Sequence, residues 1–321
     1  MNLDLLIVNI TNPVLLFFIL GIIAAALKSD LEIPPSSFKF ISIYLLFSIG
    51  FKGGQELAHS QINTTILVEL LFGVIISALI PLYTFFILKR KLDNWNAGAI
   101  ASAYGSVSAV TFVSASSFLE VQKIHFDGYL VAVMAFMEFP AIIVGVLLMK
   151  RFDSSKSGQL SLAQTLKHSI SNGSVLIIIG SLIIGYISNI KQAMEFKPFT
   201  TDIFKGFLAI FLLEMGITTA KRFSSFRKQG LFVFLFALII PAINGCVVAF
   251  LSQYFISEIG NRFIFAVLAA SASYIAVPAA MRLVAPKADP GLYIPMALGV
   301  TFPYNLTIGL PLYYLIIQFT S

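Results

Sequence analysis

The chain has 321 residues, of which 58% are hydrophobic and only 11% are charged. Because a soluble domain carries about 25% charged residues, this composition and a mean hydropathy of +0.92 exclude an ordinary soluble protein and indicate membrane lipid as the surroundings. The net charge of +6 does not indicate a nucleic-acid partner, because the basic residues lie in loops between apolar runs. The single cysteine, Cys246, excludes a disulfide or a cysteine-based metal site within one chain. No cleavable signal peptide is predicted, because no basic segment precedes the first apolar run.

Ten stretches of about 20 mostly apolar residues, the length of a membrane-spanning helix, follow one another along the chain. They cover approximately residues 9–27, 38–58, 65–88, 95–119, 127–149, 165–188, 200–220, 230–256, 261–284 and 292–319. We therefore expect an all-α integral membrane protein with ten transmembrane helices.

The Lys and Arg residues predict the orientation of these spans. If both termini lie on one face, only six of the 21 Lys and Arg share that face: Lys52, Lys123, Lys191, Lys197, Lys205 and Arg262. Cytoplasmic loops carry an excess of Lys and Arg. Both termini are therefore predicted outside.

Spans four and nine contain matching runs of small residues. The first run, residues 105–111, reads Gly-Ser-Val-Ser-Ala-Val-Thr, and the second, residues 271–278, reads Ser-Ala-Ser-Tyr-Ile-Ala-Val-Pro. A shift of 167 positions places Ser106 on Ser273. Such runs loosen a helix, and the freed backbone groups are tolerated in a membrane only inside protein or beside a wet cavity. Two discontinuous helices at corresponding places predict the binding site of a transporter.

Further landmarks repeat in the same order. Gly50 aligns with Gly216, and the Glu138-Phe-Pro stretch of span five corresponds to the Thr301-Phe-Pro stretch of span ten. Because each half has five spans, an odd number, the two halves must be inverted relative to each other. We expect residues 1–150 to form one five-helix repeat, residues 151–164 a short cytoplasmic linker, and residues 165–321 the second, inverted repeat.

The breaks could bind an anion, a cation or both. Half-helix N-termini and unpaired N–H groups favour an anion, whereas freed carbonyls and hydroxyls suit a hard cation such as Na⁺. The candidate side chains are Ser106, Ser108, Thr111, Ser271, Ser273 and Tyr274. The alternative is that these small residues only allow close helix packing.

Two acidic residues, Glu138 and Glu214, fall in the middle of predicted spans. An ionisable group at that depth is costly unless it is paired or hydrated, so each is a candidate for cation coordination or proton coupling. Glu138 is favoured over Glu214, because Pro140 weakens the helix beside it and the aligned stretch offers Thr301 and Asn305. The alternative is a protonated carboxyl group hydrogen-bonded to a neighbouring helix.

The glycines that end span two, Gly50, Gly53 and Gly54, allow two interpretations. They could lie near the substrate path, or they could form a helix end or a tight helix crossing. The sequence leaves both open.

An enzyme is not predicted. The 105–109 stretch loosely resembles a serine-nucleophile motif, but such a serine needs a base within hydrogen-bond reach. The three histidines, His59, His125 and His168, all fall at the ends of predicted spans.

With these residues the chain resembles the sodium-dependent bicarbonate transporter family, known from cyanobacterial carbon concentration. The resemblance rests on residues 48–54, 105–111, 136–141, 213–216 and 269–278. It implies ten helices in two inverted repeats, a homotrimer in the inner membrane of a bacterium, and Na⁺-coupled uptake of bicarbonate without an organic cofactor. It also raises a PII-like regulatory protein as a partner, although the linker that often carries a long insert in the family is short here.

The resemblance places the ligands at the two breaks. The candidate substrate site comprises Gly105, Ser106, Val107, Ser108, Thr111, Ser271 and Ser273, together with Tyr274. The candidate Na⁺ region comprises Ser106, Ser108, Glu138, Ser271, Ser273, Thr301 and Asn305. Two departures matter: Tyr274 stands where the family usually has Asp, and Glu138 replaces an Asp that is one methylene shorter. The loss of the acid at 274 removes a full charge from the expected Na⁺ region.

The sequence thus predicts a secondary transporter that imports a small anion, bicarbonate, with Na⁺ or with H⁺ through Glu138. Two other functions stay open. One is transport of another small anion or carboxylate. The other is a non-transporting membrane sensor of the same fold, which the loss of the acid at 274 would favour.

Overall fold

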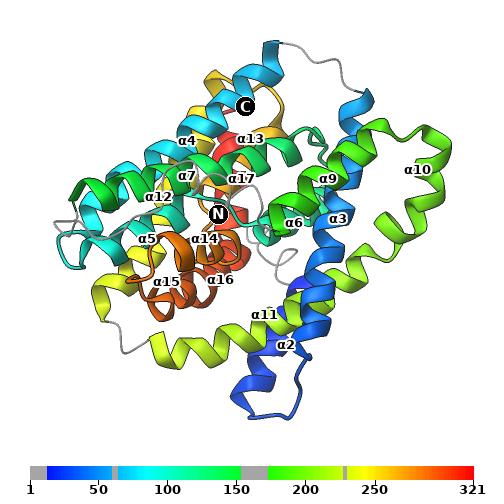
Figure 1. The fold of residues 1–321 in the computed structure, drawn as a ribbon. Coiled ribbons are helices and arrows are strands. Elements are labelled where there is room, and N and C mark those ends of the chain that lie inside the picture. The colour runs from blue at the N-terminus through cyan, green and yellow to red at the C-terminus, as the bar shows by residue number, and fades with distance from the viewer. Residues whose placement is uncertain (1–12, 60–63, 153–172, 227–229) are drawn as a thin grey trace.

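A computed structural model describes residues 13–59, 64–152, 173–226 and 230–321 (Figure 1). These residues form helices and connecting turns, with no β-strand among them. The helices before residue 153 are α2 (Pro13–Ala26), α3 (Pro35–His59), α4 (Thr64–Leu88), α5 (Asn94–Gly105), α6 (Ala109–Val121) and α7 (Leu130–Phe152). Those after residue 172 are α9 (Gly173–Ile187), α10 (Ile190–Lys197), η1 (Pro198–Asp202), α11 (Phe204–Phe226), α12 (Leu231–Leu251), η3 (Ser252–Tyr254), α13 (Ile259–Ala269), α14 (Ala276–Val284), α15 (Pro290–Met296), η4 (Ala297–Thr301), α16 (Phe302–Tyr304), η5 (Asn305–Gly309) and α17 (Leu310–Phe319).

The helices have the composition of membrane spans. Within the described residues, six helical segments are long and apolar enough to cross a bilayer, and three more apolar helices are shorter. This agrees with the predicted all-α membrane protein, while the ten-span count and the inverted repeat stay predictions. Residues 153–164, most of the predicted linker, lie outside the described residues, and α7 extends through Phe152.

Local sequence signals explain where several helices begin. Asp93 caps α5 by accepting hydrogen bonds from the backbone N–H groups of Trp95 and Asn96. Asn189 and Gln192 form a reciprocal capping box at the start of α10. Such caps satisfy the backbone donors that the first helical turn leaves without partners.

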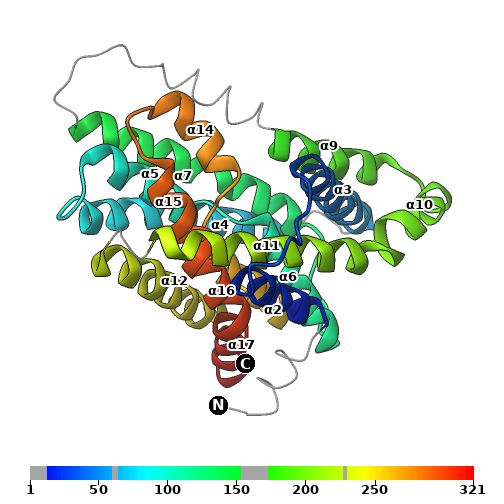
Figure 2. The same cartoon turned by 90° about the horizontal axis from the view of Figure 1, so that it is seen from below.

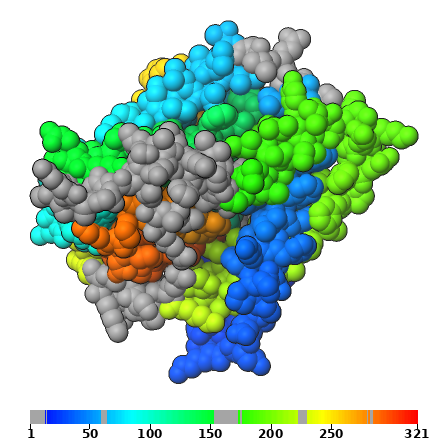
Figure 3. All heavy atoms as spheres, in the orientation of Figure 1, coloured from blue at the N-terminus to red at the C-terminus, as the bar shows by residue number. Residues whose placement is uncertain are grey.

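The helices pack in two groups. In the first, which we call the panel, α3 lies along α9 and α2 lies along α11. In the second, which we call the bundle, α4, α5 and α7 pack on one another, α12 packs on α13 and α17, and α6 packs on α13. Figures 1 and 2 show α3 and α9 side by side at one flank, and Figure 3 shows their surfaces in contact. Both discontinuous helices therefore belong to the bundle.

Glycines allow the close helix crossings within the panel. A Cβ atom at Gly50 or Gly54 would collide with a carbonyl oxygen of α9, and one at Gly21 or Gly216 would collide with a carbonyl oxygen across the α2–α11 crossing. Residues without side chains permit such approaches between membrane helices. Of the two interpretations of the α3 glycines, the structure shows the tight crossing for Gly50 and Gly54. Gly53 faces the other way, toward Val131 of α7.

Candidate functional site

The first break separates α5 from α6 by three residues. Ser106 and Ser108 have extended backbone conformations, and the Ser108 side chain caps α6 by accepting a hydrogen bond from the Thr111 N–H at 3.2 Å. A Cβ atom at Gly105 would overlap the ring of Pro81 in α4, so only glycine fits at this helix end. The first break is thus a buried and firmly held turn, with Ser106, Val107 and Ser108 all less than 5% exposed.

The second break separates α13 from α14 and is longer, covering residues 270–275. Side chains of η5 and α17 hold the end of the second break that follows α13. The Asn305 side-chain amide donates to the Ala270 carbonyl at 2.7 Å, and the Tyr313 hydroxyl donates to the Asn305 side-chain oxygen. Ile275, which directly precedes α14, provides no side-chain cap. The Ser273 hydroxyl accepts from the Val277 N–H at a long 3.3 Å.

Two hydrogen bonds tie the second break to the first break and to the end of α5. The Ser108 N–H donates to the Ser271 hydroxyl oxygen at 3.0 Å, and the Ser273 N–H donates to the Ala103 carbonyl at 2.8 Å. The Ser271 hydroxyl in turn donates to the Leu268 carbonyl at 2.8 Å. The runs of small residues therefore satisfy some of the backbone groups that each break frees, as membrane surroundings require.

A small cavity lies where the breaks meet. Its lining comes from the first break (Val107, Ser108, Ala109), the second break (Ser273, Tyr274, Ile275, Ala276), Glu138 of α7 and Leu46 of α3. Its volume of about 20 Å³ suffices for one water-sized occupant. Ala109 and Ala276 are the first residues of α6 and α14, so two helix N-termini border the same space.

Two buried polar atoms on this cavity, Glu138 Oε2 and the Tyr274 hydroxyl, have no hydrogen-bond partner in the described part of the chain. Glu138 is 4% exposed, and its Oε2 has no partner among the described residues. The buried Tyr274 hydroxyl lies near Ser108 but makes no hydrogen bond of normal geometry with any described residue. An unpaired polar group is costly away from water, so these two groups mark the wall most suited to a polar occupant.

The other predicted site residues lie behind the cavity rather than on its surface. Thr301 donates to the Ala237 carbonyl at 2.8 Å and shares a hydrogen bond with Tyr104, and Asn305 supports Ala270 as described. Ser106 is buried, and its hydroxyl has no partner in the described parts of the chain. Gly105, Thr111 and Ser271 shape or fasten the breaks. The structure thus brings Val107, Ser108, Ser273, Tyr274 and Glu138 together and leaves Thr301 and Asn305 one layer away.

Glu214, the less favoured acidic candidate, lies on α11 away from this cavity. Its Oε1 accepts a hydrogen bond from Thr218 at 3.1 Å, one turn along the same helix. It therefore does not join Glu138 at the breaks.

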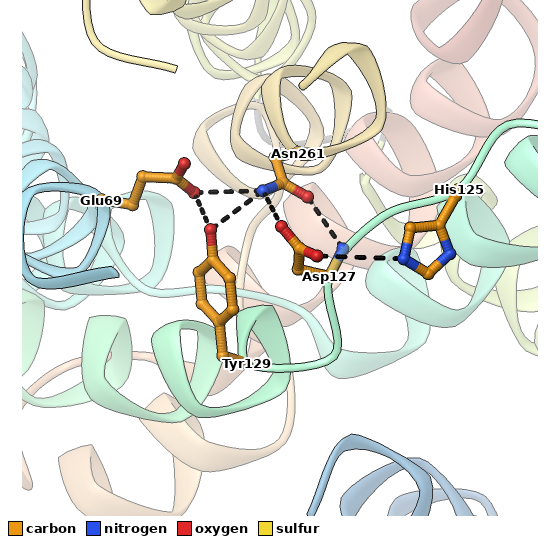
Figure 4. A network of polar contacts seen from close by, with 5 residues as sticks. All are labelled: Glu69, His125, Asp127, Tyr129 and Asn261. Carbon is orange, nitrogen blue, oxygen red and sulfur yellow. Dashed lines mark hydrogen bonds and ion pairs between the residues drawn. The ribbon is translucent and has the colours of Figure 1, made fainter. Parts of the chain in front are cut away.

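Sequence reasoning missed a second buried carboxylate, Glu69 of α4. Its Oε2 accepts from the Tyr129 hydroxyl at 2.7 Å and from the Asn261 amide of α13 at 3.3 Å (Figure 4). The same amide donates to Asp127 at 2.8 Å, and His125 lies 3.8 Å from that carboxylate. The signal that singled out Glu138, an acid inside an apolar span, applies equally to Glu69. These hydrogen bonds join α4, the α6–α7 connection and α13, so the network stabilises the packing of these elements.

Residues 13–318, nearly the whole chain, match the Na⁺-dependent bicarbonate transporter superfamily. The chain belongs to this superfamily. The resemblance predicted from the sequence is thereby confirmed. Membership implies an integral membrane transporter of an anion and not an enzyme. The helix breaks and the cavity beside Glu138 are the features of this chain on which a proposed transport function can be built. A search among curated proteins found no match.

Proposed function

We propose that the chain is a secondary active transporter that imports bicarbonate together with Na⁺, and that both bind at the cavity between the two helix breaks. The observation that carries this proposal is the meeting of both breaks and Glu138 around one cavity. The superfamily supports the substrate and the coupling ion.

The anion would be bound by the N-termini of α6 and α14. Each helix begins with an alanine on the cavity wall, Ala109 or Ala276, so a compact anion could approach the backbone N–H groups closely. Helix N-termini favour negative charge through their unpaired N–H groups and their dipole. The Ser108 and Ser273 hydroxyls add donors beside them.

The cation would be bound by oxygen atoms of the same wall. Among the described residues no group of three or more His, Cys, Asp or Glu side chains could hold a metal ion. A Na⁺ ion would therefore depend on Glu138 together with hydroxyl and carbonyl oxygens, the hard ligands that suit it. Because Tyr274 replaces an acid of the family, Glu138 would supply the charge, and proton coupling through Glu138 is the second candidate.

Transport requires the small cavity to enlarge. About 20 Å³ accommodates a water-sized occupant, so a bicarbonate ion needs the walls to separate. Of the residues that line the cavity, Leu46 belongs to the panel and the other eight belong to the bundle. We propose that the bundle moves against the panel, as in transporters that alternate access around a fixed site.

The wider assembly is proposed on the same basis: ten spans in two inverted repeats, both termini outside, and a homotrimer in a bacterial inner membrane. The paired crossings of the panel support the repeat, because α3 with α9 and α11 with α2 exchange places under it, and the aligned Gly50 and Gly216 each lie at one of these crossings. A PII-like partner would have to bind without the long insert between spans five and six that the resemblance leads one to expect, because the linker here is short.

Uptake into proteoliposomes tests the proposal. With an inward Na⁺ gradient, vesicles that hold the purified protein should accumulate labelled bicarbonate, and replacing Na⁺ by K⁺ should abolish the accumulation. Equal uptake without Na⁺ would refute Na⁺ coupling, and uptake that follows a pH gradient instead would assign coupling to H⁺.

Two results would favour the alternatives. Accumulation of a labelled carboxylate or of sulfate, but not of bicarbonate, would assign another substrate to the same site. Binding of bicarbonate that stabilises the protein by mass action, without uptake under either gradient, would indicate the non-transporting sensor.

A further inference from the structure

A second and larger cavity opens beyond the candidate site. Its volume is about 200 Å³, and charged and polar side chains of α3 and α6 line it, including Lys52, Ser116 and Glu120. Lys205 of α11 forms an ion pair with Glu120 at 2.8 Å, which joins the panel to the bundle at this cavity. Both side chains of the pair are more than half exposed, so this part of the cavity reaches the protein surface.

The two cavities share the same two walls. On α3, Leu46 lines the small cavity, and Ile49, Lys52 and Glu56 line the large one. On α6, Ala109 lines the small cavity, and Phe112, Ser116 and Glu120 line the large one. The two sets advance together at helical spacing, so α3 and α6 border one seam. By helical rise, this seam is about 15 Å long from Leu46 to Glu56.

Apolar side chains close the seam between the cavities. Leu46, Ile49 and Phe112 are all buried, with Phe112 only 1% exposed. From Leu46 to Ile49 the helix rises by about 4.5 Å, just under one turn of an α-helix. The charged residues of the large cavity and the small cavity at the breaks are therefore separated by one apolar layer.

We propose that the large cavity is the vestibule through which substrate and coupling ion reach the helix breaks, and that Ile49 and Phe112 form the gate between them. This rests on the proposed transport function. The two gate residues belong to different helix groups, because α3 packs in the panel and α6 in the bundle. A movement of the bundle against the panel would therefore separate them.

Cysteine labelling tests the vestibule without requiring transport. The single native cysteine is removed by Cys246→Ala, and Ser116→Cys or Ala109→Cys is then introduced into the full chain in sealed vesicles. A membrane-impermeant methanethiosulfonate should label Ser116→Cys at least about tenfold faster than Ala109→Cys, because a closed layer exposes the inner thiol only when it opens. Equal labelling of both positions would overturn the proposal.

Truncation of the gate should remove this protection. Ile49→Ala should speed the labelling of Ala109→Cys several-fold, whereas the matched control Ile43→Ala, on the exposed side of the same helix, should not. Phe112→Leu provides a second gate variant, if Ile49→Ala does not fold. Gate variants that leave Ala109→Cys as protected as the control does would refute the gate.

The uptake assay keeps this proposal and the proposed function apart. Absent uptake with the labelling pattern intact would refute transport and retain the vestibule. Sodium-driven uptake with the labelling pattern absent would retain transport and refute the vestibule.

Discussion

The two helix breaks are related by sequence but differ in how firmly they are held. The first has three residues, a serine cap on the following helix and a glycine wedged against Pro81. The second has six residues, and its serine cap on the following helix is longer, with the Ser273 hydroxyl accepting from the Val277 N–H at 3.3 Å. It also carries the large Tyr274 where the resemblance predicts an acid. The difference suggests a division of roles. The first break would be a rigid anchor for the anion, and the second break would be the part that has diverged at the cation side.

The largest effect is expected at the anchor. Gly105→Ala places a methyl group against the Pro81 ring, which overpacks the α4–α5 contact and should destabilise the protein by about 1–3 kcal/mol. Because the break would shift, bicarbonate uptake should be lost. The control is Gly206→Ala on α11, where a Cβ atom meets nothing within 4 Å. Thermal unfolding and uptake should match the wild type in the control, and equal behaviour of the two variants would contradict a rigid first break.

The next effect concerns the charge beside the second break. Glu138→Gln keeps the side-chain shape but removes the carboxylate, so Na⁺-driven uptake should fall at least about tenfold, a loss of about 1.4 kcal/mol of transition-state stabilisation. Thermal stability should be maintained, because the buried Oε2 has no hydrogen bond to a described residue that the substitution could break. Glu214→Gln, away from the cavity, should keep its Na⁺ dependence. Unchanged Na⁺ dependence in Glu138→Gln would separate this carboxylate from coupling.

A smaller effect is expected from restoring the family acid. Tyr274→Asp adds a carboxylate to the cavity wall, and the Na⁺ concentration for half-maximal uptake should fall by up to about tenfold, which corresponds to about 1.4 kcal/mol of added binding. Tyr274→Phe removes only the hydroxyl and should leave that concentration unchanged. A Tyr274→Asp variant with unaltered Na⁺ dependence would show that the second break takes no part in cation binding.

The smallest effect compares the two serines that border the breaks. Ser108→Ala removes the cap of α6 and should cost about 1 kcal/mol in unfolding free energy. Ser273→Ala removes a longer hydrogen bond and should cost only about 0.5 kcal/mol. Denaturant unfolding in detergent measures both. The reverse order would contradict the firmer hold on the first break.

The sequence predicted the breaks well because their signal is local. Small hydroxylated residues beside glycine or proline weaken a helix at that place, and α5 ends at Gly105 while α14 begins five residues after Ser271. The contacts across the chain could not be predicted in this way. The Ser108–Ser271 hydrogen bond and the place of Leu46 on the cavity depend on tertiary packing.

The same limit explains the displaced candidates. Thr301 and Asn305 were grouped with Glu138 by alignment of the repeats, but each uses its side chain to fasten a neighbouring backbone carbonyl. Membrane helices must satisfy freed carbonyls internally, and a sequence does not say which carbonyl a polar side chain will reach. The buried network around Glu69 carried a readable signal of its own, an acid within an apolar span.

The central claim is that a small anion binds at the cavity between the two breaks. Ala109→Leu tests it most directly, because the larger side chain would fill a space of about 20 Å³ next to the start of α6. Bicarbonate binding to the purified protein is measured by calorimetry in Na⁺, beside thermal unfolding as a check of the fold. We expect the wild type to bind and the variant to fold without binding. Binding of bicarbonate to folded Ala109→Leu with wild-type affinity would contradict the account.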